Sequence, residues 1–189
     1  EMAAELLPSV LRALDWFDRL VDEHGLLNNV PEWNFVDWAE VDRRGEGTVY
    51  NALYYRTLRV VEELARRLGL APIAERCATR AQSIREAINA RLWSEERGAY
   101  VDACVDGEQS RRLSQQSNAV CIAYDIAPPE RWERIFATIL DESRVTMTSI
   151  GMTTSAPSQV DFDEERHVVL AQPFFMHHLH RALVRAGRY

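Results

Sequence analysis

A chain of 189 residues, 47% hydrophobic and 27% charged, can fold around its own core, as one domain or as part of a larger one. Its formal net charge of −7 argues against a general nucleic-acid-binding protein, because affinity for phosphates comes from an excess of cationic side chains. No run of about eighteen apolar residues occurs, so we expect no membrane-spanning helix.

The basic residues and the cysteines exclude several kinds of catalytic and metal site. All 22 basic residues are arginine, which excludes Schiff-base lysines and Walker-type phosphate loops. Cys77, Cys104 and Cys121 are widely spread without metal-ligand spacing, so we expect reduced thiols. The first residues show no basic segment followed by an apolar stretch, so we recognise no export signal and expect a cytoplasmic protein. No cofactor motif is present.

Six segments carry the apolar spacing of helices. In the first, Pro8 suits the opening turn and Gly25 the end. The second spans about 48–68, with Thr48 as N-cap and Gly69 as the stop. The remaining four helices are predicted from Ala71-Pro72 to before the loop at 94, from about Ser114 to Tyr124, from Pro128-Pro129 to Leu140, and from Phe174 to Ala186.

Two connections interrupt this helical pattern. Alternation of apolar and polar residues between Gly98 and Gly107 predicts a small β-hairpin near 99–106. The segment 143–169 is rich in Thr and Ser and is predicted to be mostly loop, with a short strand.

The lengths of the connections predict where the loops meet. Long connections at 25–47, 94–113 and 143–169 alternate with short ones, and helices joined by short turns lie antiparallel. We therefore expect all three long loops at one end of the array, where the second, fourth and sixth helices begin.

The distribution of charge predicts two layers of helices. Three stretches at the even-numbered helices contain no Asp, Glu or Arg: Gly47–Tyr55, Leu113–Tyr124 and Val168–His180. A helix that is apolar all round is buried, so the even helices should form an inner layer and the charged odd helices an outer one. A weak repeat agrees, because Asn51-Ala52-Leu53 and Asn118-Ala119-Val120 occupy matching points of successive units.

Three outer–inner pairs predict an all-α fold, an incomplete α/α toroid in which residues 1–189 form a single partial domain. A closed toroid commonly has six pairs, so half of the ring is missing. A curved helical-repeat scaffold is the structural alternative.

The first long loop is the best candidate for a ligand wall. The stretch PEWNFVDWAEVDRRGEGTVYNALYY, from Pro31 to Tyr55, is dense in Trp and carboxylates. Flat aromatic faces beside hydrogen-bonding carboxylates suit a sugar ring. Alternatively, each Trp only anchors the loop to its own core.

The other long loops add further polar groups at the same end. Convergent carboxylates are what hydrolysis of a glycosidic bond requires, although any one of them could be a solvated or capping residue. Asp37, between Val36 and Trp38, is the one we expect to be partly buried. The loop candidates are Asp37, Glu40, Asp42 and Glu46 from the first, Asp102, Asp106, Glu108, Arg111 and Arg112 from the second, and Asp161, Asp163, Glu164 and Glu165 from the third.

His177, His178 and His180 resemble a metal-binding set but lack an acidic residue on the same helix. We expect buried or pocket-lining histidines and no metal site.

Three ordered segments resemble the bacterial α-L-rhamnosidases, inverting glycoside hydrolases with a six-hairpin α/α toroid. These are WNFVDW followed by GEGTVYNALYYRTLRVVEELARRLG, then LSQQSNAVCIAYDIAP, then FDEERHVVLAQPFFMHHLHRALVRAGRY. The resemblance implies a rhamnosyl glycoside as ligand, with Trp38 stacking on the sugar and Asp37 holding a hydroxyl or the loop itself. Trp33, Glu46 and Asn51 are further candidates for substrate binding.

The sequence departs from this family in its catalytic groups. The family's general acid lies upstream of the first helix found here, and its general base lies in a Thr-x-Trp-Glu-like stretch downstream. Neither segment occurs in the chain, so we assign no catalytic residue and expect the chain alone to be inactive.

Two other hypotheses stay open: a non-catalytic helical-repeat or carbohydrate-binding protein, and another α/α-toroid enzyme such as a lyase, a glucoamylase-like hydrolase or an epimerase. A half toroid would also expose apolar flanks, so we expect the isolated chain to self-associate.

Overall fold

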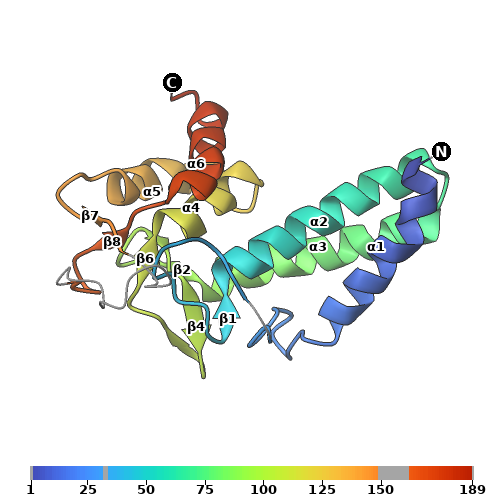
Figure 1. The fold of residues 1–189 in the computed structure, drawn as a ribbon, viewed down its shortest axis with the longest axis horizontal. Helices are drawn as coiled ribbons and strands as arrows, with labels where there is room; N and C mark the ends of the chain where they lie inside the picture. Colours follow the sequence, from blue (N-terminus) through green and yellow to red (C-terminus); the bar gives the residue numbers. More distant parts are fainter. Residues whose placement is uncertain (1, 32–33, 149–161, 189) are drawn as a thin grey trace.

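The computed structural model describes residues 2–31, 34–148 and 162–188, and its helices follow the predicted order (Figure 1). No helix in this part of the chain is both long and apolar enough to cross a membrane. The helices are α1 (Met2–Asp18), α2 (Thr48–Arg67), α3 (Ala71–Arg91), α4 (Gln115–Ala123), the short 3-10 helix η1 (Pro129–Arg131), α5 (Trp132–Ile139) and α6 (Pro173–Arg185). The strands are β1 (Glu46–Gly47), β2 (Trp93–Ser94), β3 (Ala99–Tyr100), β4 (Ala103–Val105), β5 (Glu108–Gln109), β6 (Leu113–Ser114), β7 (Val145–Thr146) and β8 (Val168–Val169).

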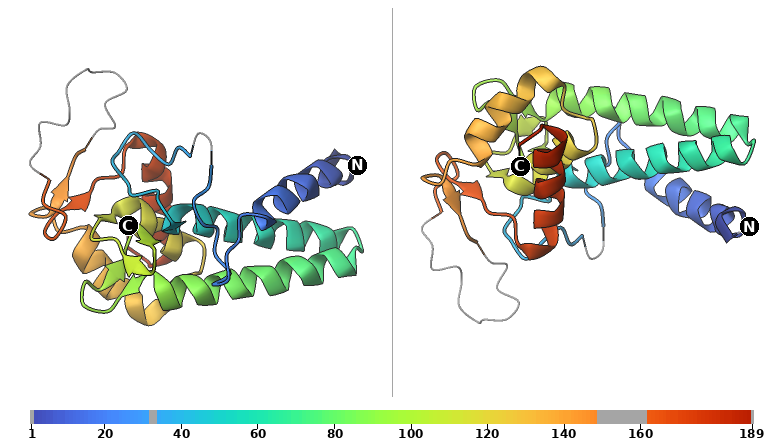
Figure 2. Two further views of the ribbon diagram at one scale, coloured as in Figure 1. Left: turned by 90° about the horizontal axis from the view of Figure 1, so that it is seen from below. Right: turned by 90° about the horizontal axis from the view of Figure 1, so that it is seen from above.

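The layering predicted from charge is clearest in α4. All nine of its residues are buried, and it packs against α2, α5 and α6. The helices α2 and α3 lie side by side as a long antiparallel hairpin that extends away from the strand-bearing end (Figures 1 and 2). On α6, Phe175, Leu179 and Ala182 are buried, whereas the side chains of Phe174 and Val184 are 63% and 62% exposed. The fold is an incomplete all-α toroid, as predicted.

Two predicted helix ends of α1 are wrong. The helix begins at Met2, so Pro8 lies inside it rather than in its first turn. The residues before Pro8 are strong helix formers and extend the helix upstream. At the other end α1 stops at Asp18, and Gly25, with φ of 84°, instead forms the turn between the bridged residues Val21 and Leu27.

The predicted N-cap of α2 is also wrong. The N-cap is Gly47 and has no capping side chain. Thr48 is turned toward the second long loop, where its hydroxyl donates to the Val101 carbonyl oxygen at 2.5 Å and its N–H to that of Asp102 at 2.8 Å. The local sequence predicted that the Thr48 hydroxyl would cap α2, but this hydroxyl instead forms a tertiary contact with Val101. The predicted stop is correct, because α2 ends at Arg67 just before Gly69.

The predicted hairpin near 99–106 is replaced by two separate pairings. The strand β3 pairs antiparallel with β2, which lies before it. The strand β4 pairs with β5 in a hairpin over 103–109, and its other edge pairs with β1 of the first long loop. Residues 99–100 and 103–105 thus belong to different sheets. In the third sheet, β8 runs parallel to β6 and β7, so that the third long loop lies beside the second.

The structure confirms the predicted repeat, because Asn51 and Asn118 form the same pattern of hydrogen bonds in successive units. The Asn51 side chain accepts from the Leu27 N–H at 2.8 Å and donates to the Leu27 and Gly47 carbonyl oxygens. The Asn118 side chain accepts from the Tyr100 N–H at 2.8 Å and donates to the Tyr100 and Ser114 carbonyl oxygens. We call each such arrangement an Asn bracket, since one side chain fastens an inner helix to the long loop before it.

The three long loops meet at the end where the inner helices begin, as their lengths predicted. The Asp42 N–H from the first loop donates to the Asp102 carboxylate of the second at 3.2 Å. The Glu40 N–H donates to the Thr148 hydroxyl of the third loop at 2.9 Å. Arg112 of the second loop bonds both the Glu40 carbonyl oxygen, at 2.8 Å, and the Glu164 carboxylate, at 2.6 Å.

Candidate functional site

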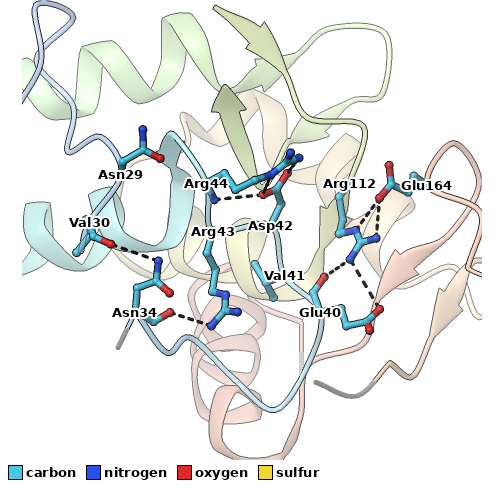
Figure 3. Close-up of a pocket in the computed structure, with 10 residues that line it drawn as sticks. All are labelled: Asn29, Val30, Asn34, Glu40, Val41, Asp42, Arg43, Arg44, Arg112 and Glu164. Carbon is cyan, nitrogen blue, oxygen red and sulfur yellow. Dashed lines mark hydrogen bonds and ion pairs between the residues drawn. The ribbon is translucent and has the colours of Figure 1, made fainter. Parts of the chain in front are cut away.

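A hollow of about 820 Å³ lies where the long loops meet (Figure 3). Most of its lining is polar, which suits a hydrophilic ligand. The lining residues are Asn29, Val30, Asn34, Glu40, Val41, Asp42, Arg43, Arg44, Arg112 and Glu164. Glu40, Asp42, Arg112 and Glu164 were among the loop residues singled out in the sequence. The structure brings these four together.

Ion pairs organise two sides of this hollow. Arg44 binds the Asp42 carboxylate through two guanidinium nitrogens, at 3.0 and 2.8 Å. Burial opposes ionisation of Asp42, but hydrogen bonds from Arg44 and Ser110 outweigh it and lower the pKa of the carboxyl. On the opposite side Arg112 pairs with Glu164 at 2.6 Å and more loosely with Glu40 at 3.8 Å.

Asp37 is buried, as predicted, at 1% exposure. One carboxylate oxygen accepts from the Trp38 N–H at 2.9 Å. The other accepts from the Gln116 side chain of α4 at 2.9 Å and from the N–H of Gln172, the N-cap of α6, at 2.8 Å. The carboxylate therefore fixes the first loop to the beginnings of two inner helices.

Trp38 follows Asp37 directly and is 46% exposed. Its ring packs edge-on against Phe35, with ring centroids 5.2 Å apart. Because the hydrogen bonds of the preceding residue, Asp37, hold the loop in place, the half-exposed indole of Trp38 can stack against a ligand ring. Trp38 does not line the hollow, so the Asp37–Trp38 pair and the hollow are two separate features of the same loop.

The other predicted binding residues have mainly internal partners. Glu46 is 3% exposed and pairs with Arg91 at 2.7 Å. Asn51 is completely buried in its Asn bracket. Any effect of these two on a ligand would be indirect, and their role in binding stays a prediction. Trp33 and Asp161 lie outside the described residues.

Asp102, which the sequence analysis counted among the polar groups of the second loop, does not line the hollow. It is completely buried and accepts hydrogen bonds from the hydroxyls of Ser114 and Ser117, at 2.5 and 2.7 Å, and from the Asp42 N–H. Within the described residues no cation pairs with it. Burial raises the pKa of this carboxyl to about 7, despite the hydrogen bonds that favour its ionised form.

The three histidines of α6 were predicted to be buried or to line a pocket, and none of them is fully buried. His177 and His180 line a shallow surface depression, and His178 Nδ1 lies 3.0 Å from the Tyr124 hydroxyl. Burial, with the nearby charges of His177 and Arg181, lowers the pKa of His178. Among the residues that the structure describes, no group of three or more His, Cys, Asp or Glu side chains could hold a metal ion.

Comparisons with known proteins agree with this architecture. A family model described as "Mannosylglycerate hydrolase MGH1-like glycoside hydrolase domain" matches residues 1–168. A search of curated protein sequences finds no significant match. A solved structure of a GH78 family rhamnosidase of Bacillus sp. GL1 aligns with a TM-score of 0.75 and 30% identity, covering 98% of this chain and 18% of that one.

A second solved structure, a rhamnosidase from Klebsiella oxytoca with rhamnose bound, aligns with a TM-score of 0.71 and 19% identity. At that identity the likeness shows the fold alone. The alignment covers 99% of this chain and 31% of the Klebsiella enzyme. The chain thus spans less than a third of either solved protein.

Proposed function

The chain belongs to the mannosylglycerate hydrolase MGH1-like glycoside hydrolase domain family and is related to GH78 rhamnosidases, and from this premise we propose that it is part of the catalytic domain of an α-L-rhamnosidase. In this proposal the whole protein releases terminal α-L-rhamnosyl residues from glycosides. The described chain contributes one part of the wall that holds the sugar.

The observation that carries the proposal is the Asp37–Trp38 pair. Trp38 presents a half-exposed ring, while all the hydrogen bonds of the Asp37 carboxylate anchor the loop beneath it. Stacking of a sugar on an indole face needs such an anchored, accessible ring. Trp38 would contact the rhamnosyl group, and Asp37 would act by holding Trp38 in place.

The same proposal assigns no catalytic residue to this chain. Inverting hydrolysis needs two carboxyl groups about 6.5–9.5 Å apart, one acting as acid and one as base on a water molecule. Asp37 and Glu46 are buried with internal partners, and Asp42 is paired with Arg44. We therefore propose that the acid and the base come from other parts of the protein and that the chain alone is inactive.

Rhamnosidase activity tests the assignment directly. The 189-residue chain and the parent protein would be compared on an aryl α-L-rhamnoside. We expect release of the aryl group by the parent only. Hydrolysis by the chain alone would contradict the placement of the acid and base. A parent that acts only on other glycosides would point to a different toroid enzyme.

A binding measurement distinguishes a loop that contacts the sugar from a loop with a purely structural role. We expect L-rhamnose to change the tryptophan fluorescence of the chain and Trp38→Ala to abolish the change. Trp16→Ala is a matched control, because Trp16 is also exposed, at 41%, but lies on α1. Equal responses from both variants would contradict a sugar site at Trp38. Binding without activity in the parent would favour a non-catalytic carbohydrate-binding protein.

We also propose that the isolated chain self-associates. The side chains of Phe174 and Val184 on α6 are 63% and 62% exposed, and those of Met2 and Leu6 on α1 are 71% and 55% exposed. Contacts between copies that bury such exposed apolar side chains would favour association. Light scattering at high concentration should give a mass above 21.7 kDa. A monomer at all concentrations would contradict this proposal.

A further inference from the structure

Gln116 is buried at the start of α4 and binds the carboxylate that anchors the first long loop. Its amide nitrogen donates to the Asp37 carboxylate at 2.9 Å and to the Leu170 carbonyl oxygen at 3.2 Å. Both neighbours are acceptors, so the amide nitrogen, and not the amide oxygen, must face them. The Gln116 Oε1 atom is consequently buried without a hydrogen-bond partner among the described residues.

This unpaired oxygen indicates what the amide contributes. A buried acceptor without a partner destabilises the folded protein. An apolar side chain such as leucine would fill the same space without that cost, but it could not donate to Asp37. A buried carboxylate needs donors around it, because burial of an unpaired charge is strongly unfavourable. Gln116 is therefore better suited to holding the Asp37 carboxylate than to packing the core.

The Asp37 carboxylate links Gln116 to Trp38. Its Oδ2 atom accepts from the Gln116 amide and from the Gln172 N–H, and its Oδ1 atom accepts from the Trp38 N–H at 2.9 Å. Among the residues that the structure describes, Gln116 is the only side chain that donates to this carboxylate. We propose that Gln116 is a positioning residue of the sugar site, which fixes the Trp38 ring by holding Asp37. This inference rests on the proposed function and adds a residue to its site.

The neighbouring Gln115 offers a matched control. It is also buried, and it also fastens α4 to the segment before α6, since its Oε1 atom accepts from the Ala171 N–H at 2.9 Å. Its amide nitrogen donates to the Ile139 carbonyl oxygen at 2.8 Å, and neither bond involves Asp37. Loss of either glutamine therefore disturbs the same part of the fold, but of the two Gln116 alone donates to the carboxylate next to Trp38.

Fluorine NMR of the full chain labelled with 5-fluorotryptophan measures the position of the ring without a ligand, and Trp38→Ala identifies the Trp38 signal. In Gln116→Leu the carboxylate loses a buried donor and turns toward solvent, so the loop is released. The Trp38 signal should move toward that of free 5-fluorotryptophan and sharpen. In Gln115→Leu it should stay at the wild-type position. Equal movement in both variants, or none in Gln116→Leu, would overturn the inference.

Gln116→Glu adds a test that does not require the leucine variant to fold. It places a second carboxyl group where the amide lies, 2.9 Å from the Asp37 carboxylate, and two carboxyl groups this close share one proton. At pH 5 the shared proton keeps the contact, so the Trp38 signal should match the wild type at that pH. As the pH rises to 9 the proton is lost, the two charges repel, and the signal should move toward the free position. A signal that follows the wild type at every pH from 5 to 9 would overturn the inference.

L-rhamnose binding separates this inference from the proposed function. Gln116→Leu should weaken the fluorescence response to rhamnose by about tenfold or more, and Gln115→Leu should leave it unchanged. A response that is lost in Trp38→Ala but kept in Gln116→Leu overturns the inference and leaves the proposed function standing. The absence of any response in the wild type contradicts the proposed sugar site, and the fluorine signal of Trp38 then still decides whether Gln116 holds the ring.

Discussion

Replacement of Asp102 by Asn should raise the stability of the protein above neutral pH. The pKa of this buried carboxyl is raised from 3.8 to about 7, because burial disfavours its charge. A raised pKa means that the folded protein holds the proton more tightly than the unfolded chain does. The stability from this group is therefore complete below pH 3.8 and is lost as the pH rises through about 7.

The size of the effect follows from the shift. One pKa unit corresponds to about 1.36 kcal/mol, so the free energy of unfolding should fall by roughly 4 kcal/mol between pH 4 and 8 because of Asp102. An Asn side chain carries no charge at any pH. Its carbonyl can accept from the Asp42 N–H while its amide donates to the hydroxyls of Ser114 and Ser117, which rotate to accept.

Urea unfolding of the wild type and of Asp102→Asn, followed by circular dichroism from pH 5 to 8, measures this difference. The gap between the two proteins should widen in favour of the variant as the pH rises. Asp102→Ala is the control, because it leaves the Asp42 N–H unpaired and should cost about 1–3 kcal/mol at pH 5. Parallel curves for wild type and Asp102→Asn across this range would refute the reasoning.

Three further changes test separate features of the fold and site. Asn118→Ala should destabilise the protein by about 2–4 kcal/mol, because it breaks three buried hydrogen bonds of one Asn bracket, and thermal unfolding should show it. Gly45→Ala should destabilise by more than about 1 kcal/mol in urea, since the backbone there has positive φ and no room for a Cβ, whereas Gly69→Ala has positive φ but open space and should cost less. Trp38→Ala should change the melting temperature little while abolishing the fluorescence response to rhamnose, and a large drop in melting temperature would instead make the ring part of the core.

The arrangement of the loops was predictable because it depends on connection length and on charge. Short turns force antiparallel helices, and uncharged stretches such as Leu113–Tyr124 must be buried. Burial of Asp37 was also predictable from its apolar neighbours. These inferences depend only on patterns within one segment of the sequence or between two neighbouring segments.

The errors came from contacts between distant segments. Thr48 is a good N-cap by type, but its hydroxyl bonds Val101, 53 residues away. The strand β4 pairs with β1, so the hairpin expected from local alternation divides between two sheets. Asp102 had no local signal for its role, because the groups that surround it come from the first loop and from the start of α4. Local patterns contain none of these partners.

The Asn brackets give the first and second helix pairs each an indicator of their own opening. The amide protons of Leu27 and Tyr100 are each held by a single side chain rather than by a regular backbone ladder. Native-state hydrogen exchange at these two amides would therefore follow the opening of the first and second units separately. If the two protons exchange at the same rate, the arc opens as a single cooperative body. If the two amide protons exchange at different rates, the two helix pairs open independently.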